Sequence, residues 1–357
     1  MKMTCKKLYK HSVFLLTAAI LFFSSCQKDP EPAPPVGEFE NAVFVVNEGN
    51  FTAGNASLTY YNYNTGEVSQ QVFYRINGAP LGDVANSITF DENSIYVVVN
   101  NSHVVYKIDA VTGKYQAKTT GLTSPRHLLK IDNQRALISD LYEKNLTLIN
   151  TENMEIISRV PLGRTSENLL NYGNKVFATN WSAFQQDKLN NMVMVIDTNN
   201  IQMVDSIQVG IEPNSMVLDK DNYLWVLCSG GFLNEELPSL WKIDPDNKNV
   251  LLHMEFPDIN SSPNSLDINK TGDTLYYLNK NIYRMAVSTD QLPDNYFIRA
   301  GGNDSFYTLG VSPESHIYVT DANDYTRNGV VNRYNPNGVL VQKFETGIVP
   351  GDIGFMY

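Results

Sequence analysis

Aromatic and hydrogen-bonding side chains recur in the turn-rich segments of this 357-residue chain. Aromatic rings stack on flat or sugar-like ligands, while arginine, asparagine and histidine provide directed hydrogen bonds. Each of these residues, taken alone, has the alternative of packing within its own loop, but the set as a whole favours ligand binding. The candidate binding residues are Phe51, Arg126, His127, Tyr142, Asn168, Trp181, Phe184, Asn214, Phe232, Tyr307, Tyr325 and Arg327.

Motifs for catalysis are absent from the sequence. It contains no G-x-S-x-G, H-E-x-x-H, G-x-x-x-x-G-K or dinucleotide-binding pattern. Among the histidines beyond residue 25, only His127 falls in a loop beside the other candidate residues, and no serine or cysteine can be assigned to it as a nucleophile. Asp321, Asn323 and Asp324 carry oxygens that a cation would accept, but without the EF-hand spacing. We therefore expect a protein that is not an enzyme and has no metal site and no required cofactor.

A repeated unit must position these side chains. Seven similar units begin at intervals of 40 to 50 residues, and we call the residues at which they begin the blade-start residues. In each unit a first strand is followed by a strongly apolar second strand, such as residues 95–99 or 224–227. The third strand ends in an Asp- and Asn-rich turn, such as residues 243–247, which is typical of hairpins. The blade-start residues are Asn86, Arg126, Asn168, Asn214, Asn264, Tyr307 and Gly351.

The two ends of the chain complete each other. Residues 353–357 read as a first strand with nothing after it, and residues 42–46, 58–63 and 67–74 read as the three missing strands. Repeats of this length, built from short strands, are typical of β-propellers. We predict an all-β, seven-bladed β-propeller with four antiparallel strands per blade, closed by one C-terminal strand that joins three N-terminal strands. Closure of this kind leaves no free edge to aggregate.

Long loops indicate which face binds. In a propeller, the loops between second and third strands lie on the same face as the blade starts, and here the long ones cover residues 48–57, 181–190, 230–238 and 322–329. Variable loops on a rigid scaffold commonly carry binding sites. A short amide or carboxylate also ends the second strand in five of seven units, either to cap the strand and hold the neighbouring loop or to contact a ligand. The residues at this position are Asn47, Val99, Asp140, Asn180, Cys228, Asn279 and Asp321.

The N-terminus has the pattern of a bacterial lipoprotein. Basic residues precede an apolar run over residues 13–23, and this run is shorter than the roughly 18 residues that a membrane span needs. We interpret residues 1–25 as a lipoprotein signal peptide, residues 26–40 as an acylated Cys26 followed by a Pro-rich acidic tether, and residues 41–357 as the propeller. The acidic start of the tether resembles the signal that exports lipoproteins of the Bacteroidetes to the outer face of the outer membrane, although a solvated linker is the alternative.

Charge and cysteine content exclude other classes. The formal net charge is −11, and removal of the four leader lysines makes it −15. Such a surface repels phosphate backbones, so we expect no nucleic-acid partner. Once Cys5 leaves with the leader and Cys26 is acylated, Cys228 is the one remaining thiol, and a disulfide within the chain is not available.

Two segments, residues 193–198 and 309–319, resemble the YncE-type seven-bladed propeller family, and the resemblance extends over residues 41–357. Together with its leader, the chain is similar to the BtuG-type lipoproteins of the Bacteroidetes. This resemblance implies cobalamin (vitamin B12) as a bound ligand and a BtuB-like, TonB-dependent outer-membrane transporter as a partner. It also implies a lipid-anchored protein on the outer membrane that faces the cell exterior. No individual residue is carried over from it.

Three hypotheses follow for the function. The first is capture of cobalamin or a related corrinoid and its delivery to the transporter. An alternative is a non-enzymatic propeller that binds another ligand or a glycan for a different surface transporter. A lactonase-like enzyme would need a metal or acid–base cluster at the central opening.

Overall fold

A computed structural model describes Phe39, residues 41–182 and residues 189–356. The expected signal peptide, the acylated Cys26, almost all of the expected tether and the candidate residue Phe184 lie outside the described residues. Among the described residues, no helix is long and apolar enough to cross a membrane.

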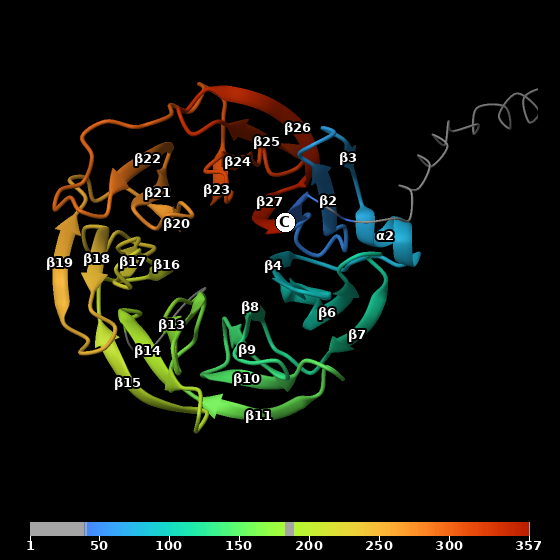
Figure 1. Ribbon diagram of the computed structural model, residues 1–357, viewed down its shortest axis with the longest axis horizontal. Coiled ribbons are helices and arrows are strands. Elements are labelled where there is room, and N and C mark those ends of the chain that lie inside the picture. Colours follow the sequence, from blue (N-terminus) through green and yellow to red (C-terminus); the bar gives the residue numbers. More distant parts are fainter. Residues whose placement is uncertain (1–38, 40, 183–188, 357) are drawn as a thin grey trace, which may run out of the picture. The chain divides into compact units, whose positions relative to one another are not determined.

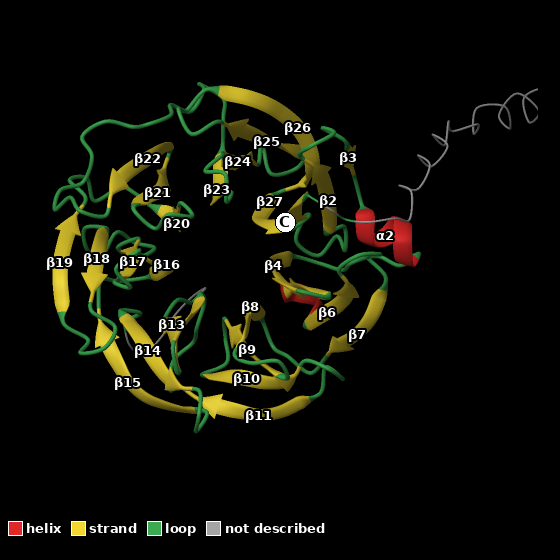
Figure 2. Ribbon diagram, viewed as in Figure 1, coloured by secondary structure: helices red, strands yellow, loops and turns green. Residues whose placement is uncertain are grey.

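Seven β-sheets form a ring, and this confirms the predicted seven-bladed propeller (Figures 1 and 2). We number the blades in chain order and call the first the composite blade. It contains β27 (Pro350–Met356), β1 (Ala42–Asn47), β2 (Ser57–Asn62) and β3 (Val68–Ser69). Blade 2 contains β4 (Ala85–Asp91), β5 (Ser94–Val99), the 3-10 helix η1 (Asn100–Ser102), β6 (Val104–Asp109) and β7 (Tyr115–Thr119).

The remaining blades follow in the same order. Blade 3 contains β8 (Pro125–Lys130), β9 (Arg135–Asp140), β10 (Asn145–Asn150) and β11 (Ile156–Pro161). Blade 4 contains β12 (Leu169–Tyr172), β13 (Lys175–Thr179), β14 (Met192–Asp197) and β15 (Gln202–Gln208). Blade 5 contains β16 (Pro213–Leu218), β17 (Leu224–Cys228), β18 (Ser239–Ile243) and β19 (Val250–Glu255). Blade 6 contains β20 (Asn264–Ile268), β21 (Thr274–Asn279) and β22 (Asn281–Ala286), and blade 7 contains β23 (Phe306–Val311), β24 (Ile317–Asp321), β25 (Asn328–Tyr334) and β26 (Leu340–Ile348).

Blade 6 departs from the regular pattern. Its fourth position is occupied by the irregular segment 287–299, which is joined to β22 by a single bridge between Ile282 and Ile298. This segment contains Pro293, which has no amide hydrogen to donate, among several polar residues. A continuous fourth strand is therefore not formed there.

The composite blade joins the two chain ends as predicted. β27 pairs with β1 in antiparallel register, with Val43 opposite Phe355 and Val45 opposite Ile353. All six residues of β1 are buried. In Figure 1, the red end of the chain lies beside the blue β2, at the same blade. The ring is therefore closed by hydrogen bonds between residues about 310 positions apart.

The predicted third N-terminal strand, residues 67–74, is wrong after Ser69. Gln71 adopts a left-handed conformation with φ of 52°, and the chain then forms helix α2 (Val72–Asn77). Val72 and Phe73 of this helix are buried in the core of blades 1 and 2. Their apolar side chains are satisfied by packing in a helix as well as in a strand, and the short run of residues does not distinguish the two.

Second strands supply the largest core side chains. Their central aromatic or leucine residues are all 3% exposed or less, and they fill the space between adjacent blades. These residues are Phe44, Tyr96, Leu137, Phe177, Trp225, Tyr276 and Tyr318.

The polar residues that end the second strands hold the neighbouring loops, and this confirms the capping interpretation. Each bonds a residue two to four positions before the blade-start residue of its own blade. The bonds join Asn47 to Gly347 (3.0 Å), Asp140 to Ser124 (2.8 Å), Asn180 to Thr165 (3.1 Å), Asn279 to Ser261 (3.2 Å) and Asp321 to Ser305 (3.0 Å). In blade 5, the buried Cys228 takes this position, and the backbone amide of Gly210 donates to its thiol.

Phe44 provides a test of the composite blade. Replacing Phe44 with alanine leaves a cavity in β1 at the point of ring closure, so we expect the free energy of unfolding to fall by about 3–5 kcal/mol. Urea denaturation measures this change. Phe51, which is 72% exposed, provides the matched control, because Phe51→Ala removes the same atoms from a loop. Equal effects of the two substitutions would contradict the packing described here.

Candidate functional site

All seven blade-start residues line one cavity on the propeller axis, with a volume of about 300 Å³. The first strand of each blade lies nearest the centre of the ring, as β4, β8, β16, β20 and β23 show in Figure 1. Its first residue consequently faces the central opening. Glu48, His127 and Glu167 add charged and titratable groups to the same lining. We call this space the central cavity.

A buried ion pair dominates one wall of the central cavity. Arg126 donates from Nε and Nη2 to the two carboxylate oxygens of Glu167, at 2.7 and 2.8 Å, so the pair is bidentate. His127 Nε2 lies 3.5 Å from the same carboxylate. Burial opposes ionisation of Glu167, but the charge of Arg126 and hydrogen bonds from His127 and Arg126 outweigh it and lower its pKa to about 2. The pair therefore remains charged and joins blade 3 to blade 4.

Tyr307 and Glu48 contribute a second polar pair. The Tyr307 hydroxyl donates to Glu48 Oε1 at 2.8 Å, and the ring of Tyr325 packs edge-on against Tyr307 with centroids 5.8 Å apart. Burial raises the pKa of Glu48, and it also raises the pKa of Tyr307. Tyr307 therefore keeps its proton and remains a hydrogen-bond donor at neutral pH.

The asparagines at the blade-start positions 86 and 214 line the cavity and also form hydrogen bonds to the next blade. Asn86 Nδ2 donates to the carbonyl of Arg126 at 2.6 Å, and Asn214 Nδ2 donates to the carbonyl of Pro263 at 2.9 Å. The side-chain amide of Asn168, by contrast, makes no hydrogen bond to any other described residue. It is available as both a donor and an acceptor at the cavity wall.

Above the central cavity lies an upper pocket of about 400 Å³, bounded by Trp181, Phe232 and the loop after β17. The Trp181 and Phe232 rings lie 5.7 Å apart, and the Arg126 guanidinium lies 5.5 Å from the Trp181 ring. The loop turns at Gly230 and Gly231, which have φ of 84° and 100°. A Cβ on Gly230 would lie 2.4 Å from the carbonyl oxygen of Glu236, so the turn requires glycine there.

The two spaces form one site, which we call the axial site. Five residues line both the central cavity and the upper pocket. The axial site thus has a polar floor and an aromatic side wall, a combination suited to holding a ligand with a flat body and polar edges. The shared residues are Arg126, Glu167, Asn214, Asn264 and Tyr307.

Seven of the twelve predicted binding residues lie in the axial site, and whether they bind a ligand stays a prediction. The seven are Arg126, His127, Asn168, Trp181, Asn214, Phe232 and Tyr307.

Four other predicted residues lie elsewhere. Phe51 and Tyr325 lie on adjacent loops, which are joined by a hydrogen bond from Asn50 to the Tyr325 carbonyl. Tyr142 is 57% exposed and lines neither space of the axial site. Arg327 pairs with Asp324 of its own loop at 2.7 Å.

Several lining residues were not among the predicted binding residues, and four of them are Glu48, Asn86, Glu167 and Asn264. Asn86 and Asn264 are blade-start residues, so the repeat itself would have identified them. Glu167 precedes a blade-start residue directly, and Glu48 directly follows the strand-end Asn47. In the sequence, only their place next to these repeated positions indicated that they would line the cavity.

The acidic loop after β24 binds its own backbone. Asp321 accepts amide hydrogens from Ser305 and Asn323, and Asp324 accepts them from Thr326 and Arg327. Across the described ranges, no three His, Cys, Asp or Glu side chains are grouped to hold a metal ion.

Residues 41–347 match the model of a protein family described as a domain of unknown function, DUF5074. The chain belongs to this family. A comparison with curated proteins finds no match to this DUF5074 chain. Neither the YncE-type nor the BtuG-type resemblance is identified by the family match, so both stay hypotheses.

Solved structures share the propeller fold. A quinonprotein alcohol dehydrogenase-like protein from Bacteroides thetaiotaomicron has a TM-score of 0.70 and 17% identity, over 89% of this chain and 79% of that one. Virginiamycin B lyase from Staphylococcus aureus has a TM-score of 0.58 and 12% identity, over 73% and 83%. AztD from Citrobacter koseri, without ligand, has a TM-score of 0.55 and 12% identity, over 87% and 96%. Likeness at these identities shows the fold alone.

Glu167 provides a pH-dependent test of the ion pair. Its pKa falls from an ordinary 4.5 to about 2 on folding, so its contribution is complete above about pH 4.5 and is lost as the pH falls toward 2. Glu167→Gln leaves the Arg126 charge buried without its partner, and we expect a loss of about 3 kcal/mol in the free energy of unfolding at pH 7. The loss should shrink as the pH is lowered from 5 to 3.

Urea denaturation at a series of pH values measures both effects. Glu92→Gln, at an exposed position in the turn after β4, is the matched control and should change stability little at any pH. A loss from Glu167→Gln that did not vary with pH would contradict the assigned ionisation.

Proposed function

We propose that the protein is a non-enzymatic ligand-binding propeller that holds its ligand in the axial site. The observation that carries this proposal is the convergence of all seven blade-start residues on one cavity that continues into an aromatic-walled pocket. The site is built from rigid strand ends, so it is formed before the ligand arrives, which reduces the ordering cost of binding. Cys228 is buried, and burial raises its pKa, so it offers no thiolate for covalent chemistry.

The groups in the axial site favour a ligand with amide edges. The Asn168 amide, which bonds no other described side chain, can pair with an amide of the ligand in both directions. The unpaired edge of the Arg126 guanidinium can donate to a ligand carbonyl, and the Tyr307 oxygen, whose hydrogen is donated to Glu48, can accept from a ligand N–H. Trp181 and Phe232 contact a flat or apolar body. The carboxylates of Glu48 and Glu167 disfavour a strongly anionic ligand.

A corrinoid has this chemistry, and we propose cobalamin or a related corrinoid as the ligand. It is large, rigid and rimmed with amides, and it would lie across the mouth of the axial site with part of its rim in the central cavity. The sequence resemblance to cobalamin-capturing lipoproteins supports the same ligand.

The leader sequence extends the proposal to the cell. A protein acylated at Cys26 would be anchored on the outer membrane, facing the exterior, and would pass its ligand to a TonB-dependent outer-membrane transporter. The support for this step is the apolar and basic pattern of residues 1–25 and the acidic tether that follows.

Binding of cyanocobalamin tests the proposed ligand and its location. Titration calorimetry and co-elution of the red ligand should show binding at about 10 μM or below, which corresponds to roughly −7 kcal/mol. Trp181→Ala removes the aromatic wall and should weaken binding about tenfold or more. Tyr142→Ala is the matched control, since it removes an exposed aromatic residue outside the axial site.

The results of these binding measurements test the identity of the ligand and the location of its site separately. No retention of cyanocobalamin by the native protein would remove the corrinoid proposal, and retention of a glycan or another ligand instead would favour the alternative accessory function. Equal binding by both aromatic variants would place the ligand outside the axial site.

A further inference from the structure

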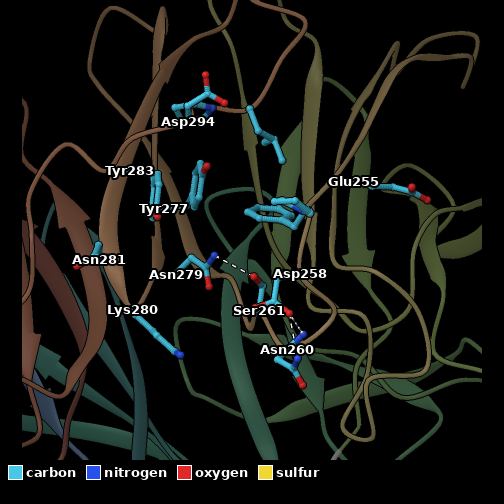
Figure 3. A pocket seen from close by; sticks show the side chains of 14 residues that line it. Glu255, Asp258, Asn260, Ser261, Tyr277, Asn279, Lys280, Asn281, Tyr283 and Asp294 are labelled. Atoms are coloured by element: carbon cyan, nitrogen blue, oxygen red, sulfur yellow. Dashed lines mark hydrogen bonds between the residues drawn. The ribbon is translucent and has the colours of Figure 1, made fainter.

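A second pocket lies in blade 6, apart from the axial site. β21 and β22 are joined by Lys280 alone, with φ of 60°, so no loop rises above the blade there. The irregular segment 287–299 replaces the fourth strand. Together with the connection between β19 and β20, these features leave a pocket of about 530 Å³, within the roughly 300–1,000 Å³ typical of small-molecule sites. We call it the blade 6 pocket (Figure 3).

One wall of the blade 6 pocket is aromatic. The rings of Tyr277 and Tyr283 are stacked, with centroids 5.4 Å apart and planes 4° from parallel, and Figure 3 shows them side by side. Phe256 packs edge-on against Tyr277 at 5.6 Å, and Leu292 joins the same cluster. Tyr283 is half-buried, so its ring remains accessible from the pocket.

Polar groups surround this aromatic wall. Asn279 Nδ2 donates to Ser261 Oγ at 3.2 Å, and Asp258 Oδ1 accepts from Asn260 at 3.0 Å. Lys280 and Asn281 lie on the side of β22, and Asp294 lies on the segment above it (Figure 3). The lining includes three carboxylates, those of Glu255, Asp258 and Asp294, and one ammonium group, that of Lys280. The pocket therefore carries an excess of negative charge that disfavours phosphate, sulfate or carboxylate ligands.

The hydroxyl of Tyr277 lacks a partner in the described part of the chain. The residue is only 1% exposed, and it lines the pocket, yet its hydroxyl forms no hydrogen bond with another described residue. A tyrosine hydroxyl that no protein group engages can still donate one hydrogen bond and accept another. A ligand with hydroxyl groups would supply the missing partner.

We propose that the blade 6 pocket binds a neutral sugar residue, with the sugar ring against the tyrosine wall and its hydroxyls bonded to Tyr277, Lys280 and Asn281. Aromatic rings contact the apolar face of a sugar, while amide, ammonium and carboxylate groups bond its hydroxyls. The lining of this pocket shares no residue with the lining of the axial site, so the two are separate pockets.

Ligand-observed saturation-transfer NMR on the full chain tests this proposal. The probes are the methyl glycosides of glucose, galactose, mannose, fucose and N-acetylglucosamine, each at up to about 10 mM, which detects binding energies near −3 kcal/mol. We expect transfer to at least one neutral glycoside. Methyl glucuronide, which carries a carboxylate, should give weaker transfer than methyl glucoside.

Tyr277→Phe is the sharpest variant, because it removes only a hydroxyl that has no protein partner and should leave the thermal unfolding midpoint unchanged. It should weaken sugar binding about fivefold, the loss of one hydrogen bond, and Tyr283→Ala should weaken it further. Trp181→Ala in the axial site should leave sugar binding unchanged, and Tyr277→Phe should leave cyanocobalamin binding unchanged.

Two results would overturn the proposal. One is the absence of transfer to every neutral glycoside in the native protein. The other is transfer that survives both Tyr277→Phe and Tyr283→Ala, since the sugar would then lie elsewhere.

Discussion

The pairing of β27 with β1 is the constraint on which the structure depends. A propeller blade has an inner first strand, and only a closed ring brings all seven inner strands around one axis. The C-terminal strand supplies the inner strand of a blade whose other strands come from residues 42–69. Once this sheet is formed, the start of every blade is fixed at the central opening. The axial site is a direct consequence of closure.

The polar axis is costly for stability. Arg126 and Glu167 are withdrawn from most of the solvent, and the carboxylate of Asp267 accepts amide hydrogens from Val311 and Ile268. Burial still raises the pKa of Asp267 to about 6. Asp352 is held in the same way by Ile88 of the next blade. An apolar axis of the same shape would often be as stable or more stable. In this chain these groups bond neighbouring blades to one another.

Much of the fold could be predicted from the sequence because the repeat is strong. The apolar second strands around Tyr96, Trp225 and Tyr318 mark the blades, and their spacing determines the count. The weaker predictions concern short segments in which tertiary packing decides the structure. Val72 and Phe73 satisfy a strand pattern, yet they are buried from a helix. In blade 6, Pro293 disfavours a regular fourth strand, but the spacing of the repeat led us to expect four strands in every blade.

The sequence placed a residue correctly at the central opening where that residue belongs to the repeat, and it did not do so where a local partner decides. Whether any of these residues binds a ligand stays a prediction. Four of the predicted residues begin blades, so ring closure brings them together at the axis whatever contacts their side chains make. They are Arg126, Asn168, Asn214 and Tyr307. Arg327 has the right chemistry but is held by Asp324 three residues before it. Glu167 resembles any surface glutamate in the sequence, and only the fold places it against Arg126, 41 residues away.

Hydrogen–deuterium exchange with and without cyanocobalamin tests the central claim most directly, because it maps the ligand onto the whole chain at once. The account predicts slower exchange in the blade-start segments of blades 3 to 7 and in the loop after β17, with little change in the outer strands β7, β11, β15 and β19. If saturating cyanocobalamin slowed exchange only in the outer strands, or only on the opposite face of the ring, the result would contradict a ligand site at the axis.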